Sequence, residues 1–183
     1  MKRWIFLHVI FLSLIPWVQA QVYLTNQGQV VFRSEAPLEL IQATSQELRG
    51  AIDASKNSFA FTIPMSSFHG FNSPLQEEHF CEKFLECHRH SKATFLGRIL
   101  EEVDFSQPGT YEIRAKGKLS IHGVTEERII RSRLTVGEDG LTVQSDFSVR
   151  LADHDVRIPQ VVYQKIAEDI SVKVSLDLKP QQP

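Results

Sequence analysis

The most reactive side chains of this sequence gather in one short segment. His79, Cys81, Cys87, His88 and His90 lie within twelve residues of one another. Thiolates and imidazoles are ligands that zinc prefers, but this spacing matches no standard zinc site. The spacing therefore disfavours a metal site, our prediction is that no metal is bound, and no cofactor is predicted from the rest of the sequence. The cysteines can form a disulfide or remain two free thiols, and the residue types alone leave these states and metal binding open.

A disulfide between Cys81 and Cys87 sets a condition on the local structure. Six residues of unbroken α-helix span about 9 Å, whereas the Cα atoms of bonded cysteines lie about 4.4–6.8 Å apart. The bond therefore requires a helix to end between them, near Leu85. Such a helix is predicted to begin with Ser73 as N-cap and Pro74 at its first position.

His154 is flanked by Asp153 and Asp155, carboxylates that suit an acid–base role. Adjacent residues of an extended chain point to opposite faces, however, which favours a polar loop held against Arg157 instead.

The remaining candidates for chemistry are weak. His69 and His122 fall in predicted turns, where a histidine is usually solvated. The chain contains no GxSxG, phosphate loop, GxGxxG or HExxH motif, so we predict no catalytic residue and no enzyme.

The elements that must position these residues are short strands. Apolar and polar residues alternate with period two in segments separated by Gly, Pro, Asn and Ser, which is typical of antiparallel sheet. These segments cover residues 22–34, 38–41, 48–52, 58–63, 93–100, 109–121, 130–136, 141–151 and 170–178. They amount to about eight strands with one short helical insertion. The fold class is all-β, and an up-and-down barrel is the simplest closure because it leaves no sheet edge.

One long strand lies in the stretch GTYEIRAKGKLSIHGVT, residues 109–125. Its apolar face carries Tyr111, Ile113, Ala115, Gly117, Leu119 and Ile121. Because Gly117 adds no side chain there, it indicates a bend, a bulge or the close approach of another group. Small inward residues such as Ala115, Gly117 and Ser145 would leave room inside the barrel.

The first twenty residues resemble a secretory signal peptide. Lys2 and Arg3 precede an apolar run, Pro16 breaks it, and Ala20 is a suitable cleavage site. We therefore predict a signal peptide over residues 1–20, a single domain over 21–183 and a periplasmic or secreted location. No later segment has about 18 consecutive apolar residues, so no membrane span is expected. Basic and acidic residues are interspersed at a net charge of −2, which argues against nucleic acid as a partner.

Three stretches together resemble the YceI-like, lipocalin-like polyisoprenoid-binding family. They are GTYEIRAKGKLSIHGVTEERII, LQEEHFCEKFLECHRHSKATFLGRI and DFSVRLADHDVRIPQVVYQKIAEDISVKV, which follow the family's order over residues 22–178. Ser91 stands where members of the family usually have proline. Cys81 and Cys87 stand at positions where they more often have polar residues other than cysteine. The resemblance implies a lipocalin-like antiparallel barrel whose central apolar tunnel binds a long-chain isoprenoid or similar amphipathic lipid.

The residues expected to bind this lipid come from the strands and the insertion. They are Phe61, Phe68, Phe71, Phe80, Phe84, Tyr111, Ile113, Gly117, Leu119 and Phe147. The function implied is lipid transport or storage, with a homodimer compatible with the sequence, and Gly117→Phe is expected to block the tunnel of a folded protein. The alternatives are a solid barrel filled by these phenylalanines, and a redox- or metal-responsive envelope protein that uses Cys81, Cys87 and the nearby histidines.

Overall fold

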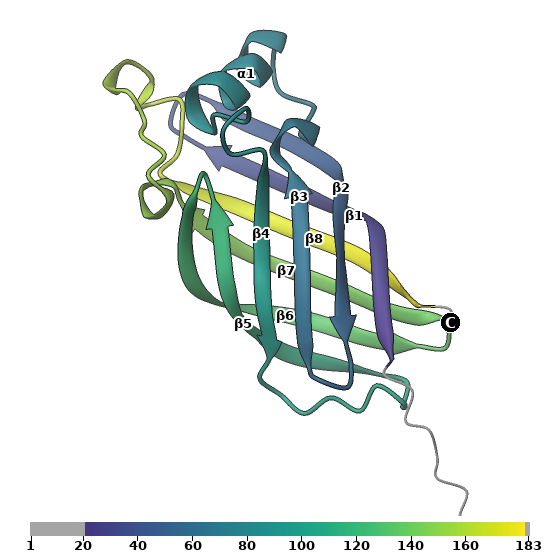
Figure 1. The fold of residues 1–183 in the computed structure, drawn as a ribbon. Coiled ribbons are helices and arrows are strands. Elements are labelled where there is room, and N and C mark those ends of the chain that lie inside the picture. The colour runs from purple at the N-terminus through teal and green to yellow at the C-terminus, as the bar shows by residue number, and fades with distance from the viewer. Residues whose placement is uncertain (1–20, 182–183) are drawn as a thin grey trace, which may run out of the picture.

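The computed structural model describes residues 21–181, which form a closed antiparallel barrel (Figure 1). Its strands are β1 (Val22–Glu35), β2 (Leu40–Asp53), β3 (Ser58–Pro64), β4 (Lys92–Ile99), β5 (Gly109–Ile121), β6 (Val124–Gly137), β7 (Gly140–Arg150) and β8 (Asp169–Pro180). Each strand pairs with the next, and β8 returns to pair with β1. The all-β, up-and-down barrel predicted from the alternation is confirmed. The signal peptide predicted over residues 1–20 lies outside the described residues.

The expected strands over residues 38–41 and 48–52 are one continuous strand, β2. A bulge between Ser45 and Leu48 shifts the pairing with β1 by one residue. The buried residues therefore change from odd positions, Ala43 and Ser45, to even positions, Leu48 and Ile52. This change of phase broke the alternation and made one strand resemble two.

Short helices and loops cover one end of the barrel, while β1 begins and β8 ends at the other (Figure 1). Helix α1 (Pro74–His79) starts as predicted, with Ser73 Oγ accepting a hydrogen bond from Gln76 N at 3.2 Å. A wider π-helical turn, Phe80–Phe84, continues it and ends at Leu85. Together with the turn Met65–Ser67 and the loop that follows it, these residues form the lid, defined here as residues 65–91. None of the described helices is long and apolar enough to cross a membrane.

A second loop region, residues 151–168, lies at the same end as the lid (Figure 1). It contains two short 3-10 turns, Leu151–His154 and Gln160–Val162. A hydrogen bond of 2.9 Å from Leu38 N to Gln164 O ties it to the turn between β1 and β2.

The end of the barrel opposite the lid is filled with side chains. Leu134, Leu141 and Leu178 are at most 2% exposed, and the rings of Tyr23 and Phe105 stack with centroids 6.2 Å apart. The barrel is therefore solid at this end, and any interior space lies toward the lid.

Asp53 organises the turn between β2 and β3. Its Oδ1 accepts hydrogen bonds from Ser55 N, Ser55 Oγ and Lys56 N, and its Oδ2 pairs with Lys56 Nζ at 2.6 Å. The Lys56 and Ser55 hydrogen bonds lower the pKa of Asp53 from 3.8 to about 2.

This shift predicts a measurable loss of stability in acid. Because the pKa is lowered in the folded state, the contribution of Asp53 is present above pH 3.8 and is lost as the pH falls through about 2. We expect Asp53→Asn to unfold more easily than the wild type at pH 6, with the difference shrinking toward pH 2. Chemical denaturation at several pH values measures this, and a difference independent of pH would contradict it.

Candidate functional site

An apolar cavity of about 500 Å³ occupies the barrel beneath the lid. All eight strands contribute inward-facing side chains to it, and residues of the lid and of the 151–168 loop complete its wall. The volume falls within the range of about 300–1,000 Å³ that is usual for ligand pockets. Since the opposite end of the barrel is filled, the cavity is closed at its base.

Most of the residues predicted to bind lipid face this cavity. Those that line it are Phe61, Phe68, Phe71, Phe80, Phe84, Ile113, Leu119 and Phe147. They come from three strands, β3, β5 and β7, and from the lid, so the fold brings distant parts of the sequence together. Their contact with a ligand stays a prediction.

Tyr111 and Gly117 are not part of the wall. Tyr111 Oη donates a hydrogen bond to Asp104 O at 3.3 Å, beside the filled end of the barrel. Gly117 lies opposite Gly97 of β4, and a Cβ atom there would lie 2.5 Å from Leu96 O. The expectation that Gly117→Phe would block the tunnel of a folded protein is therefore wrong, because the side chain would meet the neighbouring backbone first.

A cluster of four phenylalanines joins the lid to the barrel. Phe32 of β1 contacts Phe68, Phe71 and Phe80, with ring centroids 5.3, 5.8 and 5.4 Å from its own. Such aromatic pairs stabilise a contact beyond the area that they bury. Sequence reasoning missed Phe32 as a site residue, although its alternation with Val30 indicated an inward position.

Several polar residues line the cavity at the end that the lid covers. Glu39, Gln76, His79 and Lys165 come from the β1–β2 turn, α1 and the 151–168 loop. Gln76 Nε2 donates to Glu39 Oε1 at 2.5 Å. These three segments and the first residue of β2 also carry large exposed apolar residues, Leu38, Leu40, Leu75, Val161 and Tyr163. This end thus offers both polar groups and an apolar surface.

The lid is fastened to the barrel at several points. His69 and Thr44 exchange two backbone hydrogen bonds of 2.8 and 3.0 Å, and the buried hydroxyls of Ser45 and Ser67 lie 2.6 Å apart. Cys81 and Cys87 form a disulfide with their Cα atoms 4.9 Å apart. The helical turn ends at Leu85, between the two cysteines, as that bond requires.

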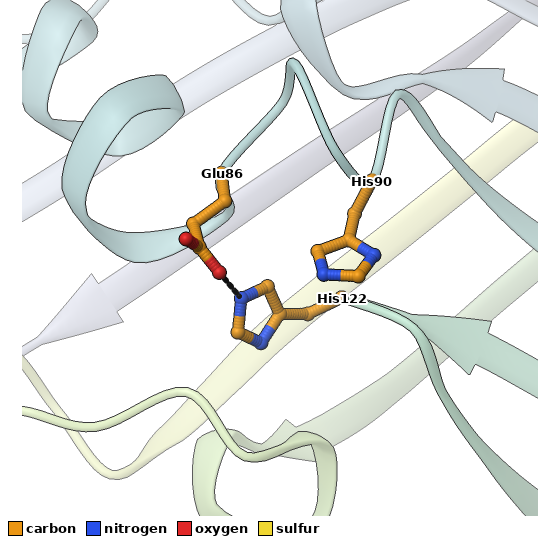
Figure 2. A group of neighbouring side chains, drawn as sticks. All are labelled: Glu86, His90 and His122. Carbon is orange, nitrogen blue, oxygen red and sulfur yellow. Dashed lines mark hydrogen bonds and ion pairs between the residues drawn. The ribbon is translucent and has the colours of Figure 1, made fainter.

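His122 is not the solvated turn residue that its position indicated. Its side chain is only 12% exposed; Nδ1–H donates to His154 O at 3.1 Å, and Nε2 lies 3.2 Å from Glu86 Oε2. Figure 2 shows Glu86 and His90 of the lid converging on it. Hydrogen bonds from Arg89 and then from His122 lower the pKa of Glu86.

His69 and His154 differ from His122 and from each other. His69 is solvated as expected, with its side chain 68% exposed and Nδ1 2.7 Å from Glu77 Oε1. His154 is fully buried, its Nδ1–H donating to Val124 O at 3.3 Å. Arg157 pairs with Asp155 of the same loop at 3.4 Å, in agreement with the expected polar loop held against Arg157. The burial of His154 removes it from contact with solvent or substrate.

Comparisons with known proteins agree with this architecture. A family model described as a YceI-like domain matches residues 25–178. A polyisoprenoid-binding domain from Saccharophagus degradans superposes with a TM-score of 0.72 at 15% identity, covering 89% of this chain and 100% of that one. Comparison with curated protein sequences finds no significant match.

Two further solved structures share the fold. BcnA of Burkholderia cenocepacia gives a TM-score of 0.66 at 16% identity, covering 82% of this chain and 94% of its own. A YceI protein of Campylobacter jejuni gives 0.57 at 11% identity, with both chains fully covered. The family model matches nearly all of the described barrel, which shows that this chain belongs to the YceI-like family.

Proposed function

We propose that this protein binds an amphipathic lipid with a long isoprenoid-like tail and serves in its transport or storage outside the cytoplasm. The observation that carries the proposal is the cavity of about 500 Å³, apolar in most of its wall and closed at its base. The tail lies among the phenylalanines, and the polar head lies near Glu39, Gln76, His79 and Lys165. Each buried methylene contributes about 0.8 kcal/mol, so such a tail binds without any catalytic group.

Native mass spectrometry and lipid extraction of the purified protein test this proposal directly. We expect a bound lipid, and we expect added long-chain polyprenol to raise the melting temperature of delipidated protein. A protein that carries no lipid and whose melting temperature does not respond to polyprenol would overturn it. The resemblance to a polyisoprenoid-binding domain supports the tail chemistry chosen for the assay.

A redox function through Cys81 and Cys87 is the second candidate, because their disulfide lies in the lid over the cavity. The double variant Cys81→Ser, Cys87→Ser separates the two functions. The variant lacks the disulfide that joins two residues six positions apart, so its unfolded chain is less constrained. This should lower the free energy of unfolding by about 2 kcal/mol. We expect its lipid affinity to stay within a few-fold of the wild type, as measured by titration under oxidising conditions. Loss of lipid binding in a folded variant, or in wild type treated with reductant, would favour redox control.

A further inference from the structure

The contact between His122 and Glu86 brings together two atoms that both accept hydrogen bonds. His122 Nδ1 faces the carbonyl oxygen of His154 at 3.1 Å, so the ring proton of neutral His122 is on Nδ1. In this tautomer Nε2 carries a lone pair and no proton. Nε2 lies 3.2 Å from Glu86 Oε2, a carboxylate oxygen that can accept a hydrogen bond but cannot donate one. The contact is favourable when a second ring proton makes Nε2 the donor to Glu86, or when a cation binds between the two atoms.

His90 supplies a third donor atom at the same place. Its ring packs edge-on against that of His122, with centroids 4.8 Å apart (Figure 2). One ligand atom from each of Glu86, His90 and His122 falls within 4.8 Å of the others. Two imidazole nitrogens and a carboxylate oxygen are a ligand set that suits zinc and its neighbours, with a fourth position left for water.

Local backbone geometry brings these three side chains together, and His122 belongs to the two-residue hairpin turn between β5 and β6. Glu86 and His122 have φ values of +43° and +51°, in the left-handed region that favours glycine or asparagine. Next to His122, a Cβ atom at Gly123 would lie 2.6 Å from Cε1 of the His90 ring. Glycine at 123 therefore makes room for His90.

From these observations we propose that Glu86, His90 and His122 bind a divalent transition-metal ion such as Zn²⁺. The hydrogen bond from His122 Nδ1–H to His154 O orients the ring in the way that metal-bound histidines usually need. Arg89 donates hydrogen bonds to both carboxylate oxygens of Glu86, at 3.0 Å to Oε1 and 3.2 Å to Oε2, so it holds the carboxylate in place and shares its negative charge with the ion. The bound ion joins the lid to the β5–β6 hairpin beside the cavity, since Leu85 and Ile121, the neighbours of Glu86 and His122, line its wall.

Isothermal titration of the purified, tag-free protein with ZnCl₂ tests the site. We expect one ion per chain, with affinity at least about tenfold weaker in each of Glu86→Gln, His90→Ala and His122→Ala. His88→Ala is the matched control, because His88 is exposed in the same loop and lies outside the cluster. We expect it to bind Zn²⁺ like the wild type.

A second readout guards against misfolded variants. ZnCl₂ should raise the melting temperature of wild type and His88→Ala but not that of His90→Ala, whose side chain is partly exposed. The proposal is overturned if wild type shows no saturable binding. It is also overturned if the folded His90→Ala variant binds Zn²⁺ as tightly as wild type, or if His88→Ala loses binding to the same extent.

Discussion

Gly117→Ala should destabilise the barrel by about 3 kcal/mol, and Gly117→Phe should not fold. At this point β4 and β5 pass each other with Gly97 and Gly117 directly opposite. A Cβ atom on Gly117 would lie 2.5 Å from Leu96 O and 3.0 Å from Leu96 C, and one on Gly97 would lie 2.5 Å from Gly117 Cα. These obstacles are backbone atoms, so relief requires the two strands to separate and break their hydrogen bonds.

Gly109→Ala on the same strand is the matched control. The nearest atom to a Cβ there is 3.5 Å away, on the ring of Tyr111, which is an ordinary contact. We expect this variant to change the free energy of unfolding by less than about 1 kcal/mol. Urea denaturation of wild type, Gly109→Ala and Gly117→Ala measures the difference, and equal stability of the two variants would show that the strands can move apart at little cost.

Residues that alternate along a strand were predicted well because their faces depend only on local geometry. The inward faces of β5 and β7 follow from period two, and so do the positions of Ile113, Leu119 and Phe147 in the cavity wall. The lid was harder to predict, since its apolar residues follow no regular period. Ser73 and Pro74 located its helix start, and the cysteines fixed where the helical turn must end.

The errors concern contacts between segments that are distant in the sequence. His122 is at a hairpin tip, but its partners Glu86 and His154 are 36 and 32 residues away. A reading of local spacing looked for metal ligands among His79, Cys81, Cys87, His88 and His90, whereas the structure groups His90 with Glu86 and His122. Gly117 was assigned to the tunnel because it lies on the apolar face of its strand. The close approach of β4 to β5 decides the role of Gly117. The alternation of apolar and polar residues along either strand does not reveal that distance.

The tail-binding cavity can be blocked at a position where the backbone has room. Ala115 lies two residues before Gly117, is 8% exposed and lines the cavity, between Ile99 of β4 and Ile130 of β6. In Ala115→Phe the added ring extends into apolar space and loses no hydrogen bond. We expect the variant to fold with a melting temperature near that of the wild type.

The same ring should weaken lipid binding strongly. If it excludes only two methylenes of the tail, the loss is about 1.6 kcal/mol, which lowers the affinity more than tenfold. Lys118→Phe, which adds the same ring on the exposed face of β5, should bind polyprenol like the wild type. Titration of the three delipidated proteins with polyprenol measures the ratio. Equal affinities with Ala115→Phe folded would place the tail elsewhere, because a ligand inside this barrel cannot avoid a phenyl ring added to the wall of a cavity of about 500 Å³.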